Sequence, residues 1–247
     1  MDNEADTAAY FAGLSRELLD NPEESATLRK IAELSVDAIP ACEWTGISLR
    51  RRRGRVETMA ASSPLADRID AWQDEHGQGP GLAAIETSVP QLVDDVRNDA
   101  RWPGWATFAG EAGIGSGLSI PLSTESHALG ALNLYAAKPF AFDAESVERA
   151  LIFTTHATTA VVAARLVSGL QTAVHSRHVI GLAQGIIMLR YDMTLEASFE
   201  VLRRYSSHTN RKLRDVAQLV VDQRALPGDY VDPDGVDGAA GGHRVQE

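Results

Sequence analysis

The run VIGLAQGIIMLRY, Val179 to Tyr191, decides how the second half of the chain is built. It contains two glycines, and no charged residue stands between His178 and Arg190. The run holds about a dozen residues, whereas a helix that spans a membrane needs roughly 20 apolar residues. We therefore interpret it as part of a helix in a protein without membrane contact.

Apolar side chains cover one broad arc of this helix, enough to pack two further helices. They are Val179, Ile180, Leu182, Ala183, Ile186, Ile187, Leu189 and Tyr191. The narrow remaining arc holds Arg177, Gly181, Gln184, Gly185 and Met188. Each glycine costs a helix up to about 1 kcal/mol relative to alanine, so we expect something to approach the backbone on this arc. Either a neighbouring helix or a nucleic acid could contact the backbone here, and the sequence does not decide between the two.

The same helix is predicted to begin far upstream, where Asp143 is placed to cap it and Glu145 lies in its first turn. No proline interrupts the pattern before Asp192, which predicts one helix of about 45 residues. Small and apolar residues alternate at spacings of four and three, the heptad rule of a coiled coil. They are Phe153, Ala157, Ala160, Ala164, Val167, Gln171 and Val174. We interpret this seam as the contact in a homodimer; the alternative is a helix that lies on the chain's own sheet.

Two shorter helices are predicted next, the first capped by Thr194 and the second by Asn210. The second has apolar residues at i, i+3, i+4, i+7 and i+8, namely Leu213, Val216, Ala217, Val220 and Val221. The remainder, residues 227–247, is rich in Gly, Pro and Asp, and we predict a disordered acidic tail there.

The junction between these two helices, RRYSSHTNRKLR, is basic. Arginine and lysine bind phosphates, hydroxyl and amide groups bind sugars and base edges, and an exposed tyrosine can stack on an unpaired base. The candidate nucleic-acid contacts are Arg203, Arg204, Tyr205, Ser206, Asn210, Arg211, Lys212 and Arg214. A solvated charged face is the alternative interpretation.

The distribution of charge favours the nucleic-acid interpretation for this segment alone. The whole chain has a formal net charge of −11. Residues 168–226, however, carry eight basic and five acidic side chains, whereas residues 1–167 carry 14 basic and 24 acidic ones. Only the segment 168–226 can attract a polyanion.

The span from Leu170 to Gln223, with HVIGLAQGIIMLRYDMT and EASFEVLRRYSSHTNRKLRDVAQLVV, resembles the ANTAR domain of transcription antitermination regulators. The resemblance implies a three-helix module on a coiled-coil stalk that binds hairpin loops in mRNA leaders and prevents a terminator from forming. Gln184 departs from the family pattern, which usually has lysine there. The missing cation reduces the expected number of phosphate contacts by one.

The first half of the chain reads as an α+β domain with a mostly antiparallel sheet. A helical pattern from Leu14 to Ile39, broken at Asn21-Pro22, precedes a hairpin around Gly54. Further strands are predicted in SVPQLVDDV, GSGLSIPLS and ALGALNLYAA, the last two paired across Thr124 to His127. Helical EHGQGPGLAAIE and the aromatic DARWPGWATFAGEAG lie between them.

Through GQGPGLAAI, DARWPGWATFAGEAGIGSGLSIPL and ALGALNLYAAKPFAFD this half resembles a GAF sensor domain of the actinobacterial GAF–ANTAR arrangement. We expect residues 1–13 to be an N-terminal extension, 14–165 the GAF-like domain and 166–226 the ANTAR-like domain. Gly81 stands where relatives commonly have cysteine, which argues against thiol-based sensing. Candidate residues for a small-molecule pocket are Trp102, Trp105, Phe108, Ser119, Asn133 and Tyr135, with core packing as the alternative for each.

Several function classes receive no support from the sequence. Cys42 is the one cysteine, which excludes an internal disulfide and suits a reducing cytoplasm. The acidic N-terminus does not resemble a signal peptide, and no metal or haem motif is present. No nucleophile is paired with a base, so we expect no enzyme. A DNA-binding helix-turn-helix regulator and a sensing or dimerisation protein without nucleic acid stay open as alternatives.

Overall fold

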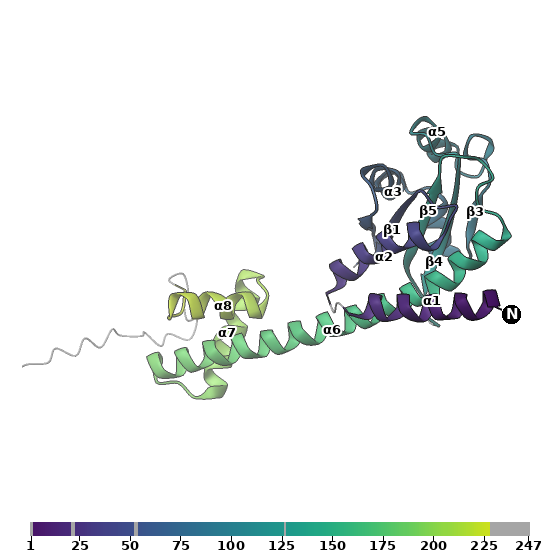
Figure 1. The fold of residues 1–247 in the computed structure, drawn as a ribbon. Coiled ribbons are helices and arrows are strands. Elements are labelled where there is room, and N and C mark those ends of the chain that lie inside the picture. Colours follow the sequence, from purple (N-terminus) through teal and green to yellow (C-terminus); the bar gives the residue numbers. More distant parts are fainter. Residues whose placement is uncertain (1, 21–22, 52–53, 126, 228–247) are drawn as a thin grey trace, which may run out of the picture. The chain divides into compact units, whose positions relative to one another are not determined.

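The computed structural model describes residues 2–20, 23–51, 54–125 and 127–227 (Figure 1). The chain divides after Ser168 into two compact units, close to the boundary predicted at residue 166. The predicted acidic tail lies outside the described residues except for Pro227.

The first unit is built on a five-stranded antiparallel sheet, as the sequence predicted. Its strands are β1 (Trp44–Arg50), β2 (Val56–Ala61), β3 (Gln91–Val93), β4 (Ser116–Ser123) and β5 (Ala128–Ala136), in the order β2-β1-β5-β4-β3. Both predicted hairpins, β1–β2 and β4–β5, are confirmed. Alternate residues of a strand point to opposite faces, so the sheet has two faces of different character.

One face is apolar and is covered by α1 (Asp2–Leu19), α2 (Glu24–Ala38) and the first part of α6 (Ala144–Tyr191). Ile47 and Leu49 of β1 pack there with Leu132 and Leu134 of β5. Because Phe11 of α1 is only 5% exposed and belongs to this core, the helix from Asp2 onward is part of the first unit and not a separate extension. The predicted boundary at residue 14 falls inside a helix.

Helix α6 confirms the predicted long helix and its cap, since Asp143 Oδ1 accepts a hydrogen bond from Ser146 N over 2.8 Å. The residues of the predicted seam, however, have different surroundings in the two halves of the helix. Phe153, Ala157, Ala160 and Ala164 are buried in the core of the first unit, so the alternative interpretation holds for them. A heptad pattern marks an apolar face but does not identify its partner. Val167 is half-buried, and Gln171 and Val174 are exposed.

The opposite face of the sheet is covered by α3 (Pro64–His76), α4 (Pro80–Thr87) and α5 (Pro103–Glu111), with the short 3-10 helix η2 (Val96–Asn98) beside α5. The sequence interpretation did not include most of α3. Its signal is nevertheless present, because Ser63 accepts a hydrogen bond from Ala66 N and Pro64 occupies the first turn.

The second unit is a small helical bundle formed by the end of α6, α7 (Leu195–Thr209) and α8 (Leu213–Gln223). Its core contains Val179, Ala183 and Ile187 of α6 together with Leu202 and Val216. Thr194 caps α7 as predicted, accepting from Ala197 N. At the far end, Tyr191 Oη accepts a hydrogen bond from Leu226 N and Arg190 donates to the carbonyl of Arg224.

Three expectations for this unit need correction. Asn210 ends α7 with a left-handed backbone (φ 53°) and does not cap α8, whose N-cap is Lys212. Asparagine tolerates this backbone conformation, so it serves either helix end. Leu182 and Leu189 were expected in the bundle core, yet they are 46% and 91% exposed. The apolar arc of α6 is wider than the surface that α7 and α8 cover.

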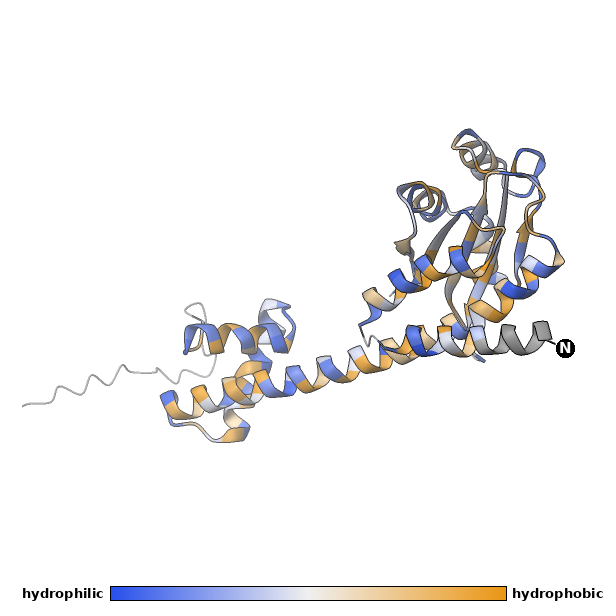
Figure 2. Ribbon diagram, viewed as in Figure 1, coloured by the Kyte–Doolittle hydropathy of each residue, from blue (hydrophilic) through white to orange (hydrophobic). Residues whose placement is uncertain are grey.

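Apolar residues occur along the whole of α6 (Figure 2). Its most apolar window reaches a mean hydropathy of 1.4, which by length and composition alone suffices for a membrane span. A single helix of this kind is weak evidence for a membrane, because the core helix of a soluble protein passes the same test. In this protein 44% of the window is buried.

Candidate functional site

A basic corner of the second unit is formed where α7 turns into α8. The carbonyl of Arg211 accepts a hydrogen bond from Ser206 Oγ over 2.6 Å, and Arg211 N donates to the carbonyl of Ser206 over 3.2 Å. These two bonds fix the backbone of the turn to the last turn of α7. Arg211 and Lys212 are therefore exposed cations on a rigid backbone.

The other arginines of the predicted site differ in their surroundings. Arg203 lies 2.6 Å from Glu200 on the same helix, and Arg214 lies 3.2 Å from Asp215. The bond to Glu200 raises the pKa of Arg203. Within the described part of the chain, no carboxylate forms a salt bridge with Arg211 or Lys212. These two side chains carry the most available positive charge of the corner.

Tyr205 does not fit the expectation of an exposed stacking residue. It is 5% exposed and packs in the bundle core with Leu202 and Val216. The residue lies on the apolar side of α7, and its neighbour Arg204 lies on the exposed side. Adjacent positions on a helix face different directions. The prediction was made from the basic composition of the junction, which does not distinguish these directions.

The narrow arc of α6 is open in the structure. A Cβ atom added at Gly181 or at Gly185 would meet no atom within 4 Å. No neighbouring helix of the described chain therefore explains these glycines. Arg177 is exposed beside them, while Met188 is half-buried.

Gln184 lies on this arc but turns toward α7. Its amide nitrogen donates to the carbonyl of Leu195 over 3.1 Å and lies 3.5 Å from Ser198 Oγ. Gln184 thus connects α6 to the first turn of α7. The structure brings the predicted residues together at two places, the α7–α8 corner and the α6 arc.

The predicted small-molecule residues lie on the second face of the sheet, in the first unit. Trp105, Ser119, Asn133 and Tyr135 are buried, whereas Trp102 and Phe108 are half-buried. Asn133 and Ser119 are direct partners on β5 and β4, and Gly46 of β1 pairs with Asn133 on its other side. A row of small and polar residues therefore crosses three strands.

A carboxylate that the sequence analysis missed lies over this row. Asp70 of α3 is 0% exposed, and its Oδ1 accepts hydrogen bonds from Tyr135 Oη at 2.5 Å, Asn133 Nδ2 at 3.0 Å and Gln73 Nε2 at 3.3 Å. Burial raises the pKa of Asp70 to about 7, and the neighbouring Asp74 adds to the increase. Asp70 was not selected from the sequence because most of α3, the helix that places Asp70 and Gln73 one turn apart, was not predicted.

Gln73 extends this network to the next helix. Its Oε1 accepts from Gly81 N at the start of α4 over 2.9 Å, and its Nε2 donates to Tyr135 Oη over 3.0 Å. Burial and the charge of Asp70 raise the pKa of Tyr135 well above its ordinary value, which keeps the phenol protonated. Four buried polar residues thus connect α3, α4 and the sheet: Asp70, Gln73, Asn133 and Tyr135. Together with the buried Ser119, the partner of Asn133 on β4, they are here called the Asp70 cluster.

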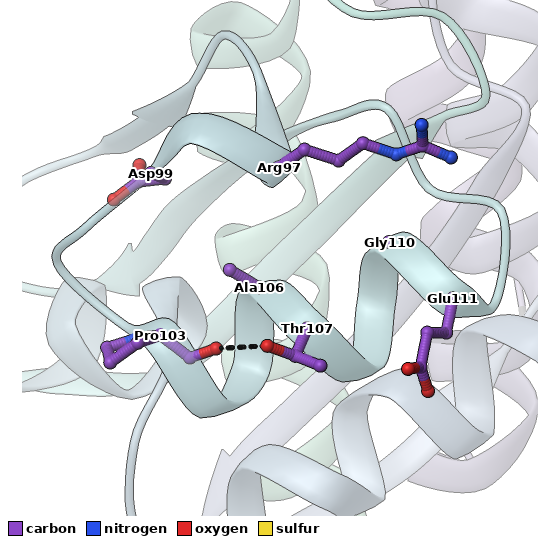
Figure 3. A pocket seen from close by; sticks show the side chains of 7 residues that line it. All are labelled: Arg97, Asp99, Pro103, Ala106, Thr107, Gly110 and Glu111. Atoms are coloured by element: carbon purple, nitrogen blue, oxygen red, sulfur yellow. Dashed lines mark hydrogen bonds between the residues drawn. The ribbon is translucent and has the colours of Figure 1, made fainter.

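Two surface clefts lie elsewhere on the first unit. One, of about 380 Å³, is lined by Arg97, Asp99, Pro103, Ala106, Thr107, Gly110 and Glu111 along α5 and η2 (Figure 3). The other, of about 680 Å³, lies against the threonines of α6 from Thr154 to Thr159 and the β4–β5 turn. Neither cleft contains a predicted small-molecule residue.

Cys42 is a buried residue in the hydrophobic core of the first unit. It is 4% exposed, and burial raises the pKa of its thiol to about 11. A thiol with such a pKa is unreactive at neutral pH.

Comparison with known proteins identifies both units. Residues 22–162 match the GAF domain family, and residues 168–221 match the ANTAR domain family. The comparison with curated proteins gives no match.

Solved structures similar to this chain include two GAF domains of phosphoenolpyruvate-protein phosphotransferases. The one from Coxiella burnetii is 16% identical, with a TM-score of 0.54, and the match covers 66% of this chain and 96% of that chain. The one from Acinetobacter is 14% identical, with a TM-score of 0.53, and covers 67% of this chain and 96% of that chain. At these identities the likeness shows the fold.

Proposed function

Because the chain belongs to the GAF domain family and carries an ANTAR domain after its GAF domain, we propose that it is a signal-responsive, RNA-binding regulator. In this proposal the ANTAR domain binds hairpins in nascent mRNA and prevents transcription termination. The GAF domain receives a small-molecule signal. A sensor followed by a regulatory module favours a cytoplasmic, non-enzymatic protein.

The basic corner is the observation that carries the RNA proposal. Arg211 and Lys212 are exposed on a backbone that Ser206 fixes, so little conformational entropy of the backbone is lost when phosphates bind. The bare glycines of the α6 arc supply a second surface, where a sugar-phosphate backbone can approach a helix closely.

A gel-shift titration of the full chain with three nucleic acids tests the proposal. They are a hairpin RNA, a DNA duplex of equal length and an unstructured RNA. We expect hairpin RNA to bind best. The double variant Arg211→Ala/Lys212→Ala should weaken hairpin binding at least tenfold and reduce the salt slope by about two units, since each lost phosphate contact removes about one.

Arg55→Ala is the matched control, because it removes an exposed arginine from the first unit. Its hairpin affinity should equal that of the wild type. Preference for duplex DNA would replace the RNA proposal with a DNA-binding regulator. Binding of neither nucleic acid would favour a protein that only senses or dimerises.

We also propose that α6 forms a homodimer contact through a different set of residues, of which only Val174 belongs to the predicted seam. At the end of the first unit Leu166 is 64% exposed, and in the second unit Leu170 and Val174 are 59% and 67% exposed. Their spacing of four residues places them on neighbouring turns of α6. Leu170→Glu should convert a dimer to a monomer in analytical ultracentrifugation, whereas Gln171→Glu should leave the dimer intact.

Transmission of the signal along α6 is the remaining part of the proposal. The helix continues without interruption from Ala144 to Tyr191. An insertion of three or four residues after Ser168 changes the rotational phase of everything that follows. We expect such insertions to abolish the effect of the signal on RNA binding, while an insertion of seven residues retains it.

A further inference from the structure

The Asp70 cluster contains three buried side-chain atoms without a hydrogen-bond partner. They are Asp70 Oδ2, Asn133 Oδ1 and Ser119 Oγ. The three residues are at most 1% exposed. Buried polar atoms are nearly always satisfied in proteins because leaving one unsatisfied costs free energy. Three such atoms within one cluster call for a specific explanation.

These atoms lie along the same row of the sheet. Ser119 and Asn133 face each other across β4 and β5, and Gly46 follows on β1. A Cβ atom at Gly46 would collide with Asp70 Oδ2, which places that oxygen directly above the row. A Cβ atom at Gly81 would lie 2.7 Å from Asn133 Oδ1. The two glycines therefore admit polar atoms where side chains would exclude them.

The character of the unsatisfied atoms defines the ligand they suit. Asp70 Oδ2 in a carboxylate and Asn133 Oδ1 only accept hydrogen bonds, and Ser119 Oγ accepts as well as donates. No basic side chain of the described chain forms a salt bridge with Asp70. A buried carboxylate without a cation is stable only when it is protonated or when a cation arrives.

We propose that the Asp70 cluster recognises the protonated amine or amidine group of a small organic cation, which donates hydrogen bonds to Asp70, Asn133 and Ser119. The inference rests on the proposed sensor function of the first unit and names the class of its signal. An anionic ligand would be repelled by the negative charge of the ionised Asp70. Among the described residues no group of three or more His, Cys, Asp or Glu side chains could hold a metal ion, and the row itself offers one carboxylate.

Binding of a cation is coupled to a proton. Burial raises the pKa of Asp70 to about 7, with Asp74 and Asp67 on the same helix adding to it. The other groups that face Asp70 are Tyr135 and Asn133 on β5 and Gln73 on α3. A cation binds the ionised carboxylate, so below pH 7 its binding releases a proton. Affinity for the cation therefore increases with pH up to about 7 and then levels off.

Calorimetric titration of the full chain tests the inference with four probes at equal ionic strength: methylammonium, guanidinium, acetate and Mg²⁺. We expect saturable binding of at least one organic cation and none of acetate or Mg²⁺. Titration at pH 6 in two buffers of different ionisation enthalpy should show the released proton. Asp70→Asn, which keeps the shape of the side chain, should weaken cation binding at least tenfold, and Ser119→Ala should weaken cation binding severalfold.

Glu75→Gln is the matched control, since Glu75 is an exposed acid on the same helix and should not affect binding. Ser119 lies on β4 and Asp70 on α3, so Ser119→Ala keeps the test valid if Asp70→Asn does not fold. The inference is overturned if no organic cation binds, if acetate or Mg²⁺ binds instead, or if affinity survives Asp70→Asn. Hairpin RNA binding without any probe is measured in parallel. If it persists while cation binding fails, only the ligand class is wrong and the proposed RNA function stands.

Discussion

The glycines of the two units have opposite surroundings. In the first unit, a methyl group at Gly46 would collide with Asp70, and one at Gly81 would press on Asn133. In the second unit, methyl groups at Gly181 and Gly185 would point into open space. In the first unit the absence of a side chain on glycine makes room for another residue of the same unit. In the second unit it leaves the helix backbone exposed to solvent. Five single substitutions test this contrast, in order of decreasing expected effect.

Gly46→Ala should have the largest effect on stability. The added methyl group forces Asp70 away from the sheet, and such overpacking costs about 1–3 kcal/mol of unfolding free energy. Urea unfolding of the full chain measures the loss. The double variant Gly46→Ala/Asp70→Ala should recover part of it because the obstructed side chain is gone. An additive double variant would show that Gly46 does not make room for Asp70.

Asp70→Asn should change how stability depends on pH. In the unfolded chain Asp70 releases its proton near its ordinary pKa of 3.8, while the folded protein holds it until about 7. The wild type therefore loses stability as the pH rises from about 4 to about 7, and this loss is complete above 7. Urea unfolding at several pH values should show that Asp70→Asn removes this part of the slope. Parallel profiles of the two proteins would mean that Asp70 ionises as easily folded as unfolded.

Gly181→Ala and Gly185→Ala should stabilise the second unit by up to about 1 kcal/mol each, because alanine favours a helix interior and meets no obstacle. The same methyl groups should weaken hairpin RNA binding severalfold by holding the RNA away from the helix. Gly169→Ala is the control, since that position is also open but lies outside the arc. It should raise stability and leave RNA affinity unchanged. Equal RNA affinity in all three variants would remove the α6 arc from the interface.

Gln184→Lys should have the smallest effect. The lysine restores a cation on the α6 arc and should raise the salt slope of RNA binding by about one unit. It also removes the hydrogen bond from Gln184 to the carbonyl of Leu195, at a cost of about 1 kcal/mol or less of unfolding free energy. A measured slope equal to that of the wild type would show that this position does not meet phosphate.

Local signals were readable from the sequence because they act over a few residues. Asp143 and Thr194 cap their helices as expected, and Gly54 and Thr124 to His127 mark real hairpins. The length of α6 also followed from the sequence, since nothing between Asp143 and Asp192 could stop a helix. The fold class could therefore be predicted from interactions between residues that are close in the sequence.

Partners distant in sequence could not be identified in the same way. The heptad residue Phe153 has the spacing of a dimer contact but packs on its own sheet. Tyr205 has the composition of a nucleic-acid contact but is buried. Asp70 and Asn133 are 63 residues apart, and no local pattern connects them. Each case depends on which surfaces meet, and only the three-dimensional packing decides that.

The chain after α8 returns to the end of α6. Tyr191 and Arg190, in the last turn of α6, are hydrogen bonded to Leu226 and Arg224, beyond α8. The intervening helices thus form a closed loop with both ends at one place on α6. A pulling force on the chain after Leu226 would therefore load α6 first, and would reach α7 and α8 only after these two bonds had broken.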